Sequence, residues 1–223
     1  MENEYALPVF IRDPLIYLEE KKITVRNKKS KPVVGFCGQT DISLFRSFWK
    51  MNFRLFNNIK FYLGFSPWYP DAIIPPTYLR RQTLENLERN NNINTKFIKR
   101  KKYKGKEYKN LDYRNSVRAE YFNNIMSTDY TVCVRGTGNF STRFYETLAM
   151  GRIPIFINTD CVLPFKEHIN WNDHMIIVQK DNLKNLAAQV LDFHNSLTSA
   201  DFNKLQYKNR ALWVDYLSFP GFF

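Results

Sequence analysis

A loop with two glycines separates an apolar segment from a predicted helix in CVRGTGNFSTRFYETLAMG, residues 133–151. Gly136 and Gly138 allow a ligand to approach the backbone closely, and the N–H groups that open the helix favour an anion. Arg143 and Glu146 are three residues apart and therefore share a face of the first helical turns. A guanidinium can grip a diphosphate, and a carboxylate can accept hydrogen bonds from ribose hydroxyls. These charges predict a nucleotide-sugar site.

The same stretch lacks the two commonest phosphate-binding motifs. The chain contains no G-x-x-x-x-G-K-[ST], and Ser141 stands where G-x-G-x-x-G requires its third glycine. Arg135, at the end of the apolar segment, supplies a second cation. Two structural alternatives stay open: a surface ion pair between Arg143 and Glu146, worth about 0.2–0.5 kcal/mol, and a capping box. The capping box requires Arg143 itself as the cap, where arginine is unfavourable.

Alternating strands and helices are needed to position this loop. The segments predicted as strands are 32–37, 130–134, 153–157 and 176–178. Besides the helix after Ser141, the predicted helices are 44–56, 78–89, 117–126, 183–197 and 202–216. This alternation predicts an α/β protein with a Rossmann-like, doubly wound parallel sheet, in which ligands bind at the carboxyl ends of the strands. Pro154 means that its strand cannot be hydrogen-bonded throughout like an ordinary central strand.

The predicted helix 44–56 carries an aromatic stripe. Its members, at spacings of three and four, are Phe45, Phe48, Trp49, Phe53 and Phe56. Aromatic residues interleaved with basic ones also suit single-stranded nucleic acid. At helical spacing, however, we expect the stripe to be buried in the core.

The chain is basic, with a net charge of +12 and a pI near 9.6. The excess is concentrated in KFIKRKKYKGKEYK, residues 96–109, which we interpret as a mobile, solvated loop. Contact of this run with nucleic acid, anionic lipid or an acidic polymer is the alternative.

Length and composition narrow the class of protein. The chain has 223 residues, of which 44% are hydrophobic, and it contains no apolar run of about 18 residues that could span a membrane. The amino terminus, MENEYALPVF, does not resemble a signal peptide. Cys37, Cys133 and Cys161 form no C-x-x-C pair and suit core thiols in a reducing compartment. The three histidines show no metal-binding spacing. We therefore expect a soluble cytoplasmic protein.

The stretch STDYTVCVRGTGNFSTRFYETLAMGRIPIFINTDCVLPF, residues 127–165, resembles the carboxyl-terminal domain of exostosin-type glycosyltransferases, particularly small microbial or viral members. Further matching segments are KPVVGFCG, RAEYFNNIMSTDY, INW and LWVDYLSFPGFF. The resemblance covers about residues 31–223, and many positions match in order.

This resemblance implies a GT-B enzyme with two Rossmann-like domains, of which the carboxyl-terminal one binds the donor. It implies inverting transfer from a nucleoside-diphosphate sugar, most simply a UDP-sugar, to a glycan hydroxyl, without a metal cofactor. Arg135 and Arg143 would neutralise the diphosphate and Glu146 would hold the ribose. The loop would be shaped by Gly136, Gly138, Asn139 and Ser141.

The amino end departs from that pattern. Only residues 1–30 precede the first matching strand, as a lead-in, a linker or a remnant, whereas a complete acceptor domain needs roughly a hundred residues. The donor domain would occupy residues 31–223, with the acceptor side rudimentary, missing or supplied by a partner chain. An inverting transfer also needs a base near the acceptor hydroxyl. Asp41 and Asp71 are the candidates, although both also suit turns. A donor-binding fragment without transfer and a polyanion-binding module are the alternatives.

Overall fold

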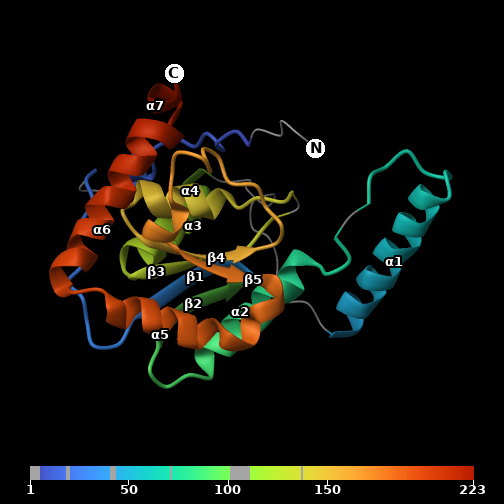
Figure 1. Cartoon of the computed structure of the whole chain (residues 1–223), viewed down its shortest axis with the longest axis horizontal. Coiled ribbons are helices and arrows are strands. Elements are labelled where there is room, and N and C mark those ends of the chain that lie inside the picture. Colours follow the sequence, from blue (N-terminus) through green and yellow to red (C-terminus); the bar gives the residue numbers. More distant parts are fainter. Residues whose placement is uncertain (1–5, 19–20, 41–43, 71, 101–110, 137) are drawn as a thin grey trace.

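A five-stranded, all-parallel sheet with helices on both faces forms the body of the protein (Figure 1). The computed structural model describes residues 6–18, 21–40, 44–70, 72–100, 111–136 and 138–223. The strands are β1 (Val33–Gln39), β2 (Asn94–Arg100), β3 (Tyr130–Cys133), β4 (Ile153–Asn158) and β5 (Ile176–Gln179). The predicted α/β class with a parallel sheet is confirmed.

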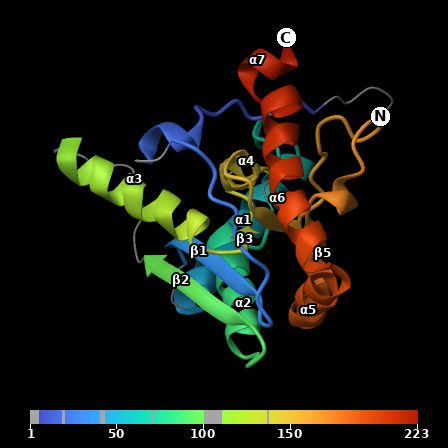
Figure 2. The same ribbon diagram turned by 90° about the vertical axis from the view of Figure 1, so that its left-hand side faces the viewer.

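The helices divide between the two faces of this sheet. They are α1 (Leu44–Tyr62), α2 (Pro76–Glu88), α3 (Leu111–Met126), α4 (Thr142–Ala149), α5 (Leu186–Ser196), α6 (Ser199–Leu212) and α7 (Phe219–Phe222). Helices α2 and α5 pack on one face, and α3 and α4 on the other (Figures 1 and 2). Shorter turns are η1 (Pro14–Tyr17), η3 (Trp171–Asp173), η4 (Lys180–Asn185) and the π-helical η5 (Trp213–Leu217).

The strand order β2-β1-β3-β4-β5 places a switch in winding direction between β1 and β3. The chain first moves outward from β1 to β2 and then returns to the other side of β1, where Val34 pairs with Tyr130. Crossovers on either side of this point cover opposite faces, and in open α/β sheets ligands bind at the carboxyl ends of the strands at such a point. The glycine loop begins shortly after β3, so the fold brings it to this edge.

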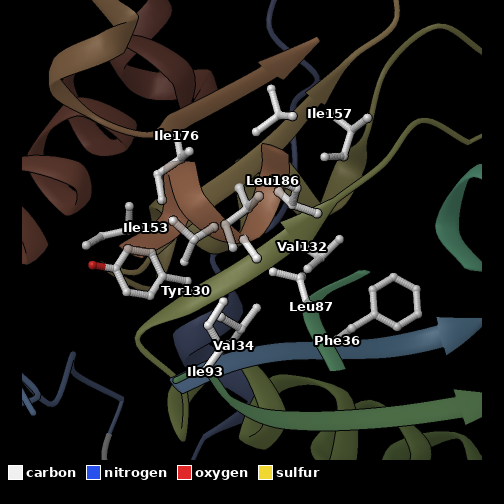
Figure 3. Packing of buried hydrophobic residues seen from close by; sticks show 14 of the residues in the cluster. Val34, Phe36, Leu87, Ile93, Tyr130, Val132, Ile153, Ile157, Ile176 and Leu186 are labelled. Atoms are coloured by element: carbon white, nitrogen blue, oxygen red, sulfur yellow. The ribbon is translucent and has the colours of Figure 1, made fainter. Parts of the chain in front are cut away.

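Alternating side chains of the strands fill two apolar layers. On one face, strand residues such as Val34 and Val132 pack against Leu87 of α2 and Leu186 of α5 (Figure 3). The opposite layer is formed by α4 and the carboxyl-terminal segments, with members that include Phe144, Leu148, Phe156, Trp171 and Trp213. The sheet is therefore buried on both faces, as expected of parallel strands joined by helical crossovers.

Strand β4 is central although it contains a proline. Pro154 pairs in register with Thr131 of β3, whereas the pairing of β4 with β5 starts only at Ile155. Proline has no N–H to donate, and Pro154 lies at the end of β4 where only β3 is paired.

The basic run expected to be a loop begins as an edge strand. Residues 96–100 belong to β2, which pairs in parallel with β1. Lys96 is exposed, while the side chain of Phe97 packs against the core. The loop prediction is wrong here because an edge strand needs only one apolar face, and lysine suits its outer side. Residues 101–109 lie outside the described residues.

The segment before β1 runs along the body of the domain. Leu15 is buried, and the carboxylate of Asp13 accepts two hydrogen bonds from the guanidinium of Arg210, at 2.9 and 2.6 Å. Arg26 forms an ion pair with the buried carboxylate of Asp129 at 2.6 Å. These contacts fix the segments 6–18 and 21–32 on the domain, and the domain boundary near residue 30 stays a prediction.

Helix α1 stands away from the sheet (Figure 1). Its periodicity was correctly interpreted as helical, but the expected burial of its aromatic stripe is wrong. The side chains are 55–71% exposed at Phe45, Phe48, Trp49, Phe53 and Phe56. The reason is topological, because α2 rather than α1 forms the crossover to β2. Among the described helices, none is both long and apolar enough to cross a membrane.

Candidate functional site

Arg143 of α4 contacts the ends of both β1 and β3. Its Nη2 donates to the carbonyl of Cys37 at 2.7 Å, and its Nη1 lies 3.5 Å from the carbonyl of Val132. The guanidinium also lies 4.3 Å from the ring centroid of Phe36. The arginine is thereby held at the carboxyl ends of both strands, and its Nε is buried with no hydrogen-bond partner in the described structure.

Gly38 makes room for this arginine. A Cβ atom at position 38 would lie 2.8 Å from Nη2 of Arg143 and 3.3 Å from the ring of Phe36. A side chain here would displace either the guanidinium or the ring. This requirement was not predicted, since a lone glycine after a strand indicates only a turn.

Glu146 lies on the same helix and contacts a tyrosine from α3. The hydroxyl of Tyr121 donates a hydrogen bond to its carboxylate, and the guanidinium of Arg143 lies 5.5 Å from the Tyr121 ring. Burial raises the pKa of Glu146, against the opposing effects of the Tyr121 hydrogen bond and the Arg143 charge. Burial, and then the charge of Glu146, also raise the pKa of Tyr121 well above its usual value, so the hydroxyl stays a donor.

Neither the ion pair nor the capping box accounts for Arg143 and Glu146. No ion pair joins Arg143 to Glu146 in the part of the chain that the structure describes. Ser141 is the N-cap of α4, so Glu146 is five residues after the cap and cannot complete a capping box, which needs three. The hydroxyl of Ser141 makes no capping bond to α4, so it does not occupy the amides at the helix start. This leaves a polar cluster of Arg143, Tyr121 and Glu146 rather than a surface pair.

The glycine loop closes on itself and on the end of β4. The N–H of Gly136 donates to the carbonyl of Phe140 at 2.9 Å. Asn139 donates to the carbonyl of Asp160 at 3.0 Å and accepts from the hydroxyl of Thr159 at 2.7 Å. Asn139 therefore ties the loop to the chain after β4.

Neither loop glycine is at positive φ. A Cβ at position 138 would lie 2.7 Å from the ring of Phe140, while one at position 136 would meet only the Phe140 carbonyl at 3.8 Å. The fold itself therefore does not require glycine at 136. Close approach of a ligand to this backbone stays a prediction.

Arg80 of α2 brings another guanidinium to this edge. Its Nη2 donates to the carbonyl of Arg135 at 2.8 Å, and its Nη1 lies 3.4 Å from the carbonyl of Gln39. The guanidinium groups of Arg80 and Arg143 thus reach the carboxyl ends of β1 and β3 from two helices, and Arg135 lies in the chain shortly after β3. Sequence reasoning missed Arg80 because nothing distinguished it from Arg81, which forms an ordinary i,i+4 ion pair with Glu85.

The two candidates for the catalytic base, Asp41 and Asp71, lie outside the described residues. Cys133 is fully buried beside α4, and burial raises the pKa of its thiol to about 12, so it fits the core role expected from its sequence. Within the described residues, no group of three His, Cys, Asp or Glu side chains is placed to hold a metal ion.

Comparisons with known proteins agree on one family. The exostosin GT47 domain matches residues 75–192, slightly more than half of the chain. An exostosin-1 homolog of Caenorhabditis elegans is 38% identical over 100 residues, which is 45% of this chain and 25% of that protein. A probable glucuronosyltransferase of Oryza sativa subsp. japonica is 28% identical over 94 residues, or 42% of this chain and 20% of that protein. The chain thus matches a quarter or less of these relatives.

A solved structure, the crystal structure of TarM, aligns with 89% of this chain and 35% of its own chain. The TM-score is 0.39 and the sequence identity 12%.

Proposed function

The chain belongs to the exostosin GT47 family, and from this premise we propose that the β1/β3 edge binds a nucleoside-diphosphate sugar for transfer to a glycan hydroxyl. The observation that carries the proposal is that the guanidinium groups of Arg80 and Arg143 lie at the carboxyl ends of β1 and β3, next to the loop that carries Arg135. Guanidinium groups suit a diphosphate, and the carboxylate of Glu146 lies on the same helix as Arg143.

We propose a role for each charged group on the basis of the described contacts. Arg143 is held by two strand carbonyls and by the ring of Phe36, so its guanidinium is positioned before a ligand arrives. Arg135, at the loop, would meet the same diphosphate from the other side. Fixed cations of this kind stabilise negative charge on a leaving group without a reorganisation cost, and they take the role that a metal ion has in other transferases. We therefore propose transfer without a metal cofactor.

Glu146 suits the ribose. Its carboxylate already accepts one hydrogen bond from Tyr121, and a carboxylate offers about four acceptor positions. Two ribose hydroxyls could use the positions that remain. A uracil base and an inverting mechanism complete the proposal. Asp41 and Asp71 stay the candidates for the base that accepts the proton of the acceptor hydroxyl.

The short match to the relatives supports a narrower second candidate. Because the chain spans a quarter or less of their length, it could bind the donor and leave the acceptor to a partner chain or a further domain. Donor hydrolysis or transfer measured on this chain separates the two candidates.

The test is a thermal-shift screen of the purified chain with UDP, UDP-glucuronate, other UDP-sugars and GDP-sugars. UDP-glucuronate is included because several relatives are named as glucuronosyltransferases. A ligand at about 100 times its Kd should stabilise the fold by about 2.7 kcal/mol.

A matched pair of arginine variants on α2 makes the test specific. Arg80→Ala should reduce the UDP-induced shift, whereas Arg81→Ala should not, because Arg81 pairs with Glu85 away from the strand ends. Absence of any shift with all nucleotides, or equal effects of the two variants, would contradict the proposed site.

A further inference from the structure

Helix α1 has one face that nothing in the described structure covers, and we propose that this face docks on an anionic lipid surface. We call it the aromatic face; its members are Phe45, Phe48, Trp49, Phe53 and Phe56, all exposed. The aliphatic residues Leu55, Ile59 and Leu63 add to the exposed apolar surface of this helix and its end. The inference does not depend on what the β1/β3 edge binds.

Contacts within the chain show which side of α1 is already covered. The segment after α1 turns back along the opposite, more polar side, where Nη1 of Arg54 donates to the carbonyl of Ala72 at 2.7 Å. On that side the ring of Phe61 lies 5.4 Å from the ring of Tyr69. The returning segment thus packs against the side that carries Arg54 and leaves the aromatic face outward.

Charge indicates the kind of surface that this face meets. Between Ile42 and Pro70 the sequence has no Asp or Glu, but it has Arg46, Lys50, Arg54 and Lys60. Lys50 and Lys60 are exposed, and Nζ of Lys60 lies 4.5 Å from the ring centroid of Phe56, at the margin of the aromatic face. Lysines at such a margin can extend toward lipid phosphates while their stems stay on apolar surface. The net charge of +12 adds long-range attraction to an anionic surface.

These features together describe an interfacial helix. Such helices have low overall hydrophobicity, Trp and Phe on one face and basic residues on the other, and they lie in the plane of the headgroups. Trp49, on the aromatic face and 63% exposed, is a residue type enriched at that depth. Nucleic acid fits less well, because the aliphatic residues offer nothing to bases and the guanidinium of Arg54 is engaged with the backbone.

Docking would also orient the candidate site. Helix α1 begins at Leu44, five residues after β1 ends at Gln39, so it leaves the sheet at the carboxyl edge. Arg80 and Arg143 lie at the same edge. A surface that holds α1 would therefore be reached from the edge of the sheet that carries the candidate site.

The test uses the full chain and extruded vesicles, either pure phosphatidylcholine or with about three parts in ten phosphatidylserine as the anionic lipid. We expect cosedimentation with the anionic vesicles, and at least tenfold weaker partitioning, roughly 10–100-fold, for Phe48→Ser/Phe53→Ser. The control Ile16→Ser/Tyr207→Ser, which alters exposed residues on η1 and α6, should bind like the wild type. Calorimetric UDP binding reports separately on the β1/β3 edge.

Quenching of tryptophan fluorescence by brominated lipids reports which tryptophans enter the bilayer. Trp49 and Trp68 are 63% and 81% exposed, whereas Trp171 and Trp213 are buried. Quenching should therefore affect Trp49, which lies on the aromatic face, and Trp49→Phe should remove that quenching. Equal binding to neutral vesicles, loss of binding in the control variant, or capture of single-stranded RNA in place of vesicles would overturn the proposal. Self-association through α1 that blocks vesicle binding would also overturn it.

Discussion

Helices α4 and α1 both carry neighbouring aromatic residues, yet the fold uses them in opposite ways. Phe144 and Tyr145 of α4 are 1% and 5% exposed, while Phe48 and Trp49 of α1 are 65% and 63% exposed. The aromatic content of a helix therefore does not show whether the rest of the fold covers it.

Topology accounts for the difference. Helix α4 joins β3 to β4, which are neighbouring parallel strands, so it must cross the sheet and pack on it. Helix α1 also follows a strand, but α2 completes the crossover from β1 to β2 and already covers the sheet there. A helix that is not needed for a crossover is free to present its apolar face elsewhere.

The largest effect should appear when one phenylalanine is truncated in each helix. Phe144→Ala should lower the free energy of unfolding by about 3–5 kcal/mol. The centroid of the Phe144 ring lies 5.3–5.4 Å from the ring centroids of Phe156 and Trp171, so removal of the ring leaves a cavity. Phe48→Ala should change stability by no more than about 0.5 kcal/mol, as at other exposed sites. Urea denaturation measures both. A similar loss in the two variants would show that α1 packs on the body in solution.

A smaller effect, on ligand binding, should distinguish the charged residues of the two helices. Arg143→Ala should weaken UDP binding by about 1.5–3 kcal/mol, or roughly 10–150-fold, since charge-assisted hydrogen bonds to the diphosphate are lost. Arg143→Lys keeps the charge without the planar fork and should fall between the alanine variant and the wild type. Lys50→Ala in α1 should leave the affinity unchanged. Calorimetry measures all three, with unfolding of the unliganded variants as the stability control. Unchanged affinity in Arg143→Ala would remove this arginine from the donor site.

Much of the sheet could be predicted because buried parallel strands are short apolar runs. The segments 130–134, 153–157 and 176–178 were recognised from branched and aromatic residues and became β3, β4 and β5. Strand β2 was missed because an edge strand carries lysines on its open side, and its sequence then reads as a charged loop.

The candidate site was predicted only where its residues are close in sequence. Arg135, Arg143 and Glu146 lie within twelve positions of one another, so their pattern could be read directly. Arg80 and Tyr121 reach the same edge from α2 and α3, and only the order of the strands brings those helices there. Contacts of this kind depend on tertiary structure and leave no local pattern.

The smallest expected effect is on the pH dependence of protein stability. It comes from the buried carboxylate of Glu146 on α4, and exposed α1 has no counterpart. Burial raises the pKa of Glu146 in the folded state, so the folded protein binds this proton more tightly than the unfolded chain. Stability should then fall as the pH rises from the ordinary glutamate pKa, about 4.3, to the folded value. In Glu146→Gln this fall should be absent, and the variant should exceed the wild type in urea midpoint at neutral pH.

Tyr121→Phe sharpens the same prediction. The hydroxyl of Tyr121 lowers the Glu146 pKa by donating to the carboxylate, so its removal should extend the pH-dependent loss of stability to higher pH. Glu146→Gln should at the same time weaken UDP binding a few-fold, because a neutral amide accepts hydrogen bonds less strongly than a carboxylate. A variant that is more stable and binds less well would indicate that the buried charge is kept for a ligand rather than for the fold. Equal pH profiles in the wild type and Glu146→Gln would contradict the raised pKa, and unchanged UDP affinity would contradict the ribose role.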